Sequence, residues 1–239
     1  MLNTNATYKA IVGGDYTTEC RVIIEDTSGT EHTVGHEGLI SIETSEGCFD
    51  TFGIGNAVAA EVNLTMLVPK TWTPKRMARM RVHFRVKNAT QTSSWYVKGI
   101  FYIDTRERTK NLYGEDIMII HGYDRMLMSE QMYANVSWTT KRDYEVLQEI
   151  CTKLPEWTLN SETLTYLQAQ PAINISTPYG FTYREVLQSI AGMRAGNFVI
   201  DEAGRLKFIP LNSAPAETFY LITPQGNPIT IGGDRIVLR

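Results

Sequence analysis

The stretch that decides the fold runs from residue 95 to residue 127 and reads WYVKGIFYIDTRERTKNLYGEDIMIIHGYDRML. Two apolar runs, Trp95–Asp104 and Asp116–Gly122, flank a charged connection that contains a glycine, which is typical of two strands joined by a turn. After the second run, Tyr123–Leu127 leads toward a segment with helical periodicity. This stretch therefore marks the point where an all-β unit passes into a mixed one.

The sequence before this point is dominated by strand patterns. Apolar and polar residues alternate from Val58 to Met66, which predicts a half-buried strand. The alternation is sharpest over Arg79–Lys87, where basic and apolar side chains point to opposite faces. A polar loop and the strand at Trp95 follow, so we expect a hairpin with one strongly cationic face. The side chains of that face, called the basic stripe below, are Arg79, Arg81, His83, Arg85 and Lys87.

After Tyr123 the hydrophobic period becomes that of helices. Arg142–Leu154 has one apolar stripe, which predicts a helix. A second helix is predicted after Thr182, which forms a capping-box pattern with Glu185, and Gly196 is its expected C-terminal cap.

A hairpin is predicted after the second helix, with strands Asn197–Ile200 and Arg205–Ile209. The fold class is therefore α+β, with an all-β part followed by a small α/β module of two helices plus a hairpin. The chain stops on an apolar strand pattern at Arg239, so we expect either that the natural protein continues or that this strand closes on the β part.

Charge is segregated along the chain although the net charge is only −3. Residues 1–69 contain 2 basic and 10 acidic residues, whereas residues 70–110 contain 11 basic and 2 acidic ones. Such asymmetry indicates an anionic partner, or two regions that complement each other across an assembly.

No motif in the chain predicts catalysis, a cofactor or a metal. The sequence has no G-x-S-x-G, Walker or G-x-G-x-x-G pattern that opens a helix. His32 and His36 have a spacing that zinc proteins use on helices, but their segment is turn-like, so we expect solvent-exposed loop histidines. We therefore expect a protein that is not an enzyme, with no cofactor and no metal site.

Cellular location is constrained by the same composition. Three cysteines without a CxxC spacing argue against a disulfide framework. The N-terminus lacks a signal pattern, and no apolar run approaches the ~20 residues that a membrane helix needs. We expect folding in a cytoplasm and no membrane insertion.

Three interpretations of the basic stripe are open. It is a solvated strand face, protected from aggregation by charge, or it is a subunit interface that pairs with the acidic first third of the chain. The third interpretation is contact with a nucleic-acid backbone, although that face carries no aromatic side chain on which bases could stack.

Five blocks of sequence, in a fixed order, cover most of residues 50–210. They are Phe52–Leu64, Gly99–Asp104, Ile120–Leu127, Thr182–Ala191 and Ile200–Leu206. Together they resemble the hub proteins at the distal end of bacteriophage tails, that is, the baseplate hub or N-terminal structural module of tail-associated proteins in prophages.

The resemblance implies a β-barrel tube-type hub domain, residues 1–128, with a small α/β domain, residues 129–212, inserted in it or appended to it. Residues 213–239 would return to the barrel or start a further domain. It also implies a homotrimer around the tail channel, in the virion tail, assembled in the cytoplasm of the host bacterium. The implied partners are a distal tail or tail-tube ring protein and a tip or fibre protein, with DNA only in transit.

Under this resemblance the basic stripe is expected to be a subunit interface, because a channel wall that binds phosphates tightly would impede DNA. Two alternatives to a purely structural hub remain. One is the N-terminal structural part of a tail-associated peptidoglycan hydrolase, and the other is a nucleic-acid-binding β protein.

Overall fold

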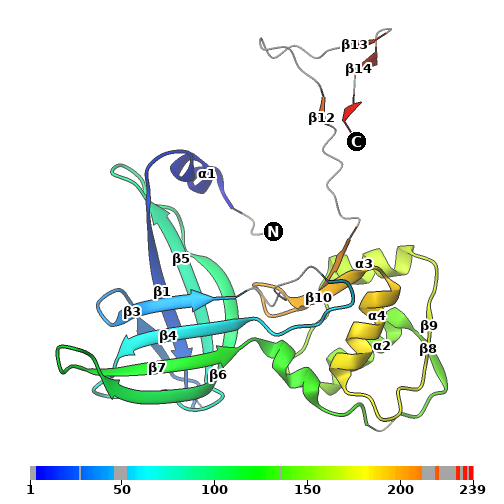
Figure 1. Ribbon diagram of the computed structural model, residues 1–239, viewed down its shortest axis with the longest axis horizontal. Coiled ribbons are helices and arrows are strands. Elements are labelled where there is room, and N and C mark those ends of the chain that lie inside the picture. The colour runs from blue at the N-terminus through cyan, green and yellow to red at the C-terminus, as the bar shows by residue number, and fades with distance from the viewer. Residues whose placement is uncertain are drawn as a thin grey trace.

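The structure, a computed structural model, describes residues 4–26, 28–45, 53–134 and 136–211, and the backbone of four two-residue strands further along. The first half builds a large antiparallel sheet, and most helices lie in the second half (Figure 1). The fold class is therefore α+β, as predicted. None of the helices in these described ranges is long and apolar enough to cross a membrane.

The large sheet has seven strands in the order β2-β1-β5-β6-β7-β4-β3, and each neighbouring pair is antiparallel. The strands are β1 (Thr17–Glu25), β2 (Glu31–Val34), β3 (Leu39–Thr44), β4 (Glu61–Leu67), β5 (Arg79–Lys87), β6 (Tyr96–Lys110) and β7 (Asp116–Tyr123). The predicted hairpin of β5 and β6 is confirmed. β6 continues to Lys110, so the connection to β7 is shorter than the sequence suggested.

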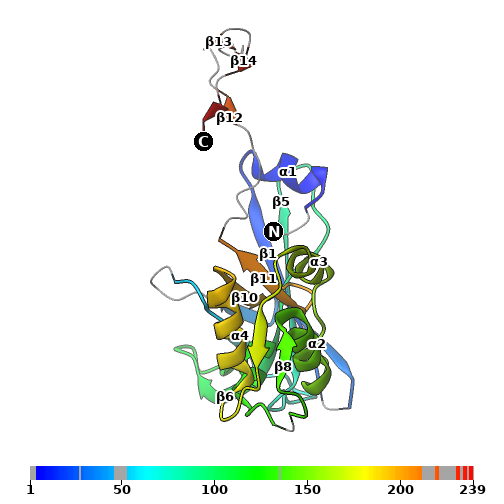
Figure 2. The same ribbon diagram turned by 90° about the vertical axis from the view of Figure 1, so that its right-hand side faces the viewer.

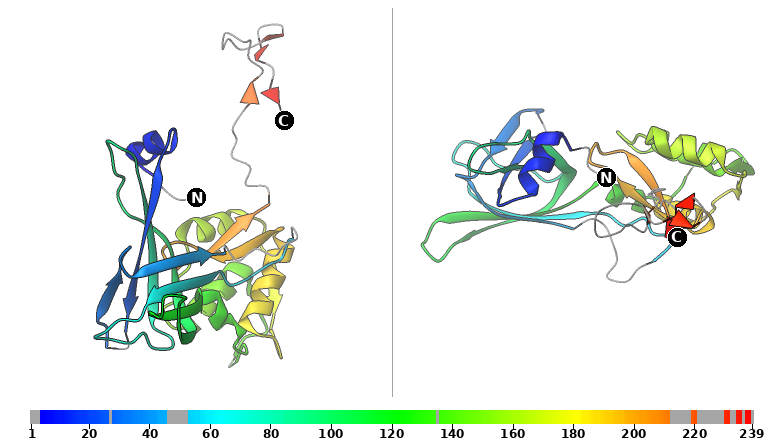
Figure 3. Two further views of the ribbon diagram at one scale, coloured as in Figure 1. Left: turned by 60° about the vertical axis from the view of Figure 1, so that its left-hand side comes forward. Right: turned by 90° about the horizontal axis from the view of Figure 1, so that it is seen from above.

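The sheet is strongly curled, but a closed barrel is not detected in the described residues (Figure 3). The end strands β2 and β3 are joined by the turn at residues 35–38, yet no backbone hydrogen bonds pair them among the described residues. The turn instead binds the far end of β4, where Leu67 N donates to Gly38 O at 2.8 Å. This contact directs β3 onto β4 rather than back onto β2.

The apolar face of the curled sheet encloses one core. The pattern of alternation explains it, because every second residue of a strand points to the same face. Its buried members are Val22, Ile24, Val34, Val62, Leu64, Met66, Ala78, Met80, Val82, Phe101, Ile103, Met118 and Ile120.

A short helix, α1 (Ala6–Val12), precedes the sheet and was not predicted. Asn5 caps it, since Tyr8 N donates to Asn5 Oδ1 at 2.8 Å. The ring of Tyr8 lies edge-on to that of Tyr96, with centroids 5.2 Å apart. Two turns of helix are too short to give a periodic signal in the sequence.

The second unit packs helices on two small two-stranded sheets (Figure 2). Its elements are η1 (Arg125–Glu130), β8 (Thr140–Arg142), α2 (Asp143–Lys153), α3 (Ser161–Ala169), β9 (Asn174–Ser176), α4 (Tyr183–Met193), β10 (Gly196–Ile200) and β11 (Leu206–Pro210). The prediction of two helices was wrong, because α3 is a third. Its start is set by Asn160, whose side chain accepts from Glu162 N at 2.9 Å, and not by a long apolar stripe.

The two predicted helices are confirmed as α2 and α4. The capping box at α4 is present, with Thr182 N donating to Glu185 Oε2 at 2.7 Å and Glu185 N donating to Thr182 Oγ1 at 3.2 Å. The left-handed residue after the helix is Ala195, with φ 49°, and not the predicted Gly196, which begins β10.

The four short strands near the end of the chain pair with each other. They are β12 (Phe219–Tyr220) with β15 (Val237–Leu238), and β13 (Thr230–Ile231) with β14 (Asp234–Arg235). Most of residues 213–239 lie outside the described residues, so the expectation that they return to the barrel or start a further domain stays a prediction.

Candidate assembly surface and domain junction

The basic stripe lies on the outer face of β5, beside β1. The register places Arg79 opposite Glu25 and Arg85 opposite Glu19. Side chains directly opposite each other in an antiparallel pair lie close enough to interact, so this register brings opposite charges together.

Each of the four cations in the stripe pairs with a carboxylate of the same chain. Arg79 pairs with Glu25 and Arg81 with Glu31, whereas Arg85 and Lys87 share Glu19. Arg85 lies 2.6 Å from the Glu19 carboxylate. Hydrogen bonds from Lys87 and Arg85 hold the pKa of Glu19 below its usual range. Part of the charge segregation seen in the sequence is therefore compensated within one chain, by carboxylates of β1 and β2.

The fifth member of the stripe, His83, is buried and makes a local contact. Its Nδ1 lies 3.1 Å from Arg81 O. Burial lowers the pKa of this imidazole, so the side chain is neutral at pH 7.

An aromatic ring lies on this face, contrary to the sequence analysis. The guanidinium carbons of Arg21 and Arg85 each lie 4.4 Å from the ring centroid of Trp95. In the β5–β6 hairpin, Phe84 pairs with Tyr96, so the next position along would place Trp95 opposite Arg85. The register of this hairpin is therefore the signal from which Trp95 could have been predicted on this face.

His32 is not the solvent-exposed loop residue that we expected. It lies on β2, its ring stacks on Trp72 with centroids 4.2 Å apart, and its Nε2 lies 3.3 Å from Asp26 Oδ2. Within the described ranges, no three His, Cys, Asp or Glu side chains gather as metal ligands would.

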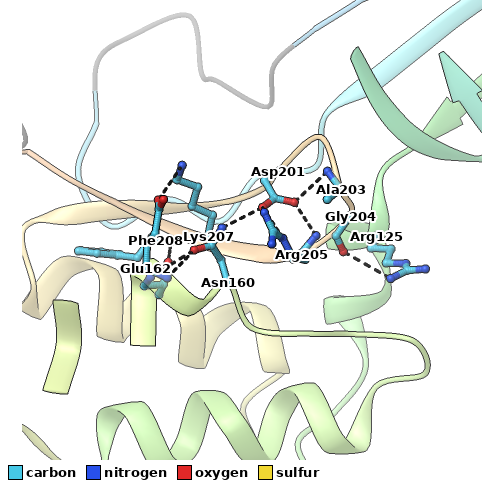
Figure 4. A network of polar contacts seen from close by, with 10 residues as sticks. Arg125, Asn160, Glu162, Asp201, Ala203, Gly204, Arg205, Lys207 and Phe208 are labelled. Carbon is cyan, nitrogen blue, oxygen red and sulfur yellow. Dashed lines mark hydrogen bonds and ion pairs between the residues drawn. The ribbon is translucent and has the colours of Figure 1, made fainter. Parts of the chain in front are cut away.

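The sheet and the second unit meet at a junction centred on Arg125, which is 7% exposed. Its Nε donates to the Tyr102 hydroxyl of β6 at 2.7 Å, and its Nη2 donates to Glu156 Oε2 at 2.5 Å. Its Nη1 donates to the carbonyl oxygen of Glu156. The same Nη1 donates to the carbonyl oxygen of Gly204 at 3.4 Å (Figure 4). One guanidinium therefore connects the sheet, the segment after α2 and the β10–β11 turn.

That turn is itself fixed by the buried carboxylate of Asp201 (Figure 4). Asp201 Oδ1 accepts from Ala203 N at 3.0 Å and Arg205 N at 2.8 Å. Its Oδ2 accepts from Asn160 Nδ2 at 3.0 Å, and Asn160 also caps α3. The turn that receives Arg125 is thus held rigidly to the second unit.

The segment before β4 forms a second part of the junction. Gly55 N donates to Gly196 O at 2.9 Å, and Phe198 N donates to Asn56 O at 2.8 Å, so this segment lies along β10. Gly55 has φ +85°, and a Cβ there would lie 3.3 Å from Gly192 Cα of α4. Ala57, although it lies in the first half of the sequence, packs in the core of the second unit.

A cavity of about 290 Å³ lies between the two units. Its wall includes Ile100 of β6, Val199 and Ile209 of the hairpin, and Asp124. Asp124 is 5% exposed, and its side chain caps η1 by accepting from Met126 N at 2.8 Å. Burial raises the pKa of Asp124 to about 7.

Comparisons with known proteins return solved structures of tail proteins. No family model and no curated protein matches the sequence. The chain is similar to a tail protein from Neisseria meningitidis, with 14% identity, a TM-score of 0.49, and coverage of 82% of this chain and 51% of that one. It is also similar to the 43 kDa tail protein of prophage MuSo2 from Shewanella oneidensis, with 13% identity, a TM-score of 0.46, and coverage of 80% and 52%.

A third structure is a prophage tail protein from Listeria monocytogenes, with 8% identity, a TM-score of 0.49, and coverage of 85% and 55%. The chain thus spans about half the length of each of these three structures.

Proposed function

We propose that this chain is a structural, non-catalytic subunit of a phage tail tip or baseplate hub. In this role three copies surround the tail channel and link the tail tube or distal tail ring to the tip or fibre protein. DNA passes through the channel without being bound tightly.

One observation carries the proposal: the five blocks on which the resemblance rests all contribute to the junction. Gly55 belongs to the first block, Tyr102 to the second and Arg125 to the third. The fourth provides Gln188, whose carbonyl oxygen would lie 3.4 Å from a Cβ at Gly55, and the fifth provides Gly204. The resemblance therefore follows a specific way of joining two units, which supports a common architecture.

The rigidity of the junction is consistent with a structural subunit. A buried guanidinium that satisfies four acceptors from three segments resists bending between the units, because opening the junction would leave polar groups unpaired. A structural subunit of a tail needs such a fixed shape to hold a channel open.

The domain bounds are part of the proposal: a hub domain at residues 1–128, an α/β domain at 129–212, and a β segment at 213–239 that returns to the barrel or starts a further domain. One part of residues 1–128 packs with the second unit, because Ala57 and Ala59 lie in the core of that unit.

The basic stripe stays a proposed subunit interface, formed by Arg79, Arg81, His83, Arg85 and Lys87. Its cations are already paired within the chain, so the surface offers a neighbour balanced charge rather than free cations. The same pairing disfavours the nucleic-acid alternative, since phosphates would have to compete with carboxylates already in place.

Native mass spectrometry of the purified chain tests the proposal. We expect a species of three times 27.0 kDa. A monomer that binds single-stranded DNA with a steep salt dependence would contradict the hub and favour a nucleic-acid-binding protein.

A further inference from the structure

The second half of β6 presents a free strand edge. β5 pairs with β6 only as far as Tyr102, opposite Arg79, whereas β7 stays paired with β6 to Lys110. Among the described residues, no backbone hydrogen bond reaches Thr105–Lys110 from a strand other than β7. β7 is also paired with β4 on its other side, so only the β6 side of this hairpin, called the arm below and seen in green at the lower left of the right panel in Figure 3, is a free edge.

The tip of this arm holds two apolar side chains in water. Leu112 is 101% exposed and Tyr113 is 88% exposed. The tip is nevertheless ordered, since Asn111 Oδ1 accepts from Tyr113 N at 2.9 Å and from Glu115 N at 3.0 Å. An ordered turn that holds a leucine and a tyrosine away from the protein is typical of an anchor that fills a pocket elsewhere.

The same chain offers a matching edge and a matching pocket. β3 is an end strand of six residues whose outer edge is unpaired within the described part of the chain. Beside its Leu39 end lies an open cavity of about 380 Å³, lined in part by Leu67, Val68 and Trp72.

Strand direction allows the two edges to pair in a ring. Three antiparallel steps separate β6 from β3 in the sheet, so the two strands run in opposite directions. An antiparallel pair between β6 of one copy and β3 of the next therefore gives both copies the same orientation, as a head-to-tail ring requires. It also places Leu112 and Tyr113 at the Leu39 end of β3, beside the cavity.

Charge favours the same pairing. The free edge contains Arg106, Arg108 and Lys110 against one acidic residue, Glu107, and of these cations Arg108 pairs with Asp116 of β7 at 2.8 Å. Residues 35–45, which include β3 and the turn before it, contain two glutamates and neither lysine nor arginine. Opposite net charges steer the two edges together and disfavour the pairing of like edges.

We propose that copies of this chain associate head to tail through these two edges, with β3 of one copy added to Thr105–Lys110 of the next and the arm tip seated beside Trp72. This inference rests on the proposed function in one respect: both require that copies of the chain form a ring.

Cross-linking between differently tagged copies tests the interface. One protein carries Leu112→Cys in the arm tip, and the other carries His36→Cys. His36 is exposed in the turn before β3. After mixing and oxidation we expect a disulfide-linked species that contains both tags and disappears on reduction. The matched control replaces His36→Cys with Tyr179→Cys, at an exposed tyrosine on the second unit, and is expected to give no such species.

A second variant removes the anchor without touching the core. Leu112→Ser combined with Tyr113→Ser is expected to shift the assembly to monomer in native mass spectrometry while the unfolding midpoint stays unchanged. Tyr179→Ser is expected to leave the assembly intact.

The outcomes separate this inference from the proposed function. Trimers that form without the specific cross-link overturn this interface and leave the hub in place. The cross-link in an assembly that is not a closed trimer supports the interface and contradicts the hub. A chain that never associates contradicts both.

Discussion

The basic stripe and the junction both use arginine, but in opposite surroundings. In the stripe, Arg81 pairs with Glu31 while its side chain stays 30% exposed. In the junction, Arg125 is enclosed and its guanidinium satisfies groups from three segments. Partly exposed ion pairs contribute little to stability, whereas a buried cation with fixed partners is costly to remove. The junction therefore contributes more to the stability of the fold than the stripe does.

The largest expected effect separates these two arginines directly. Arg125→Ala is expected to lower the free energy of unfolding by about 3 kcal/mol, because the carbonyl groups of Glu156 and Gly204 and the Tyr102 hydroxyl lose their donor. Arg81→Ala in the stripe should lower it by less than ~1 kcal/mol. Urea unfolding measures both, and equal losses would contradict the distinction.

The next effect depends on pH and concerns Asp124 in the junction. Its folded pKa of about 7 lies above the unfolded value of 3.8, so the folded protein holds this proton to higher pH. The free energy of unfolding should therefore fall as the pH rises from about 4 to 7, by at most about 1.4 kcal/mol per pH unit.

Asp124→Asn keeps a residue that caps a helix well but cannot ionise. Relative to this variant, the wild-type protein should lose about 2 kcal/mol between pH 5 and pH 7 in thermal or urea unfolding. Parallel pH profiles for the two proteins would show that Asp124 does not titrate in this range.

A smaller difference in the free energy of unfolding is expected between alanine substitutions at two glycines with nearly the same backbone conformation. Gly55 in the junction has φ +85° and lies against α4, whereas Gly29 in the β1–β2 turn has φ +82° and open space around it. Gly29→Ala should cost about 1 kcal/mol for its left-handed backbone. Gly55→Ala should cost about 2 kcal/mol, since the methyl group also meets the helix. If the two losses are the same, the junction is looser than the structure indicates.

The smallest effect on stability is expected for Glu19→Gln, which frees Arg85 and Lys87 in the stripe. Unfolding should change little because these groups stay in contact with water. The variant should instead gain salt-dependent affinity for DNA in a fluorescence titration. Glu162→Gln, which frees Lys207 in the second unit, is the matched control. Unchanged DNA affinity on Glu19→Gln would mean that the pairing does not mask the stripe.

The elements that the sequence predicted are those with a local signal. Alternation identified β4 and β5, and the capping box at Thr182 identified α4. α1 and α3 were missed because each is only two to three turns long and is started by one asparagine, Asn5 or Asn160.

The candidate sites were harder to predict because their contacts are distant in sequence. The stripe was visible as a pattern, but its pairing with Glu19 and Glu25 depends on β1 lying beside β5, about 60 residues away. Arg125 lies in the third of the resembling blocks, but the sequence did not indicate its role, since its partners Tyr102, Glu156 and Gly204 share no motif. Only the fold brings them together.

Electron cryo-microscopy of the assembled chain tests the central claim most directly. We predict a ring of three copies around an open channel, with the second units fixed to the sheets through Arg125 and the basic stripe against a neighbouring subunit. A monomer, an assembly without a channel, or a ring whose stripe lines the open pore would contradict this prediction.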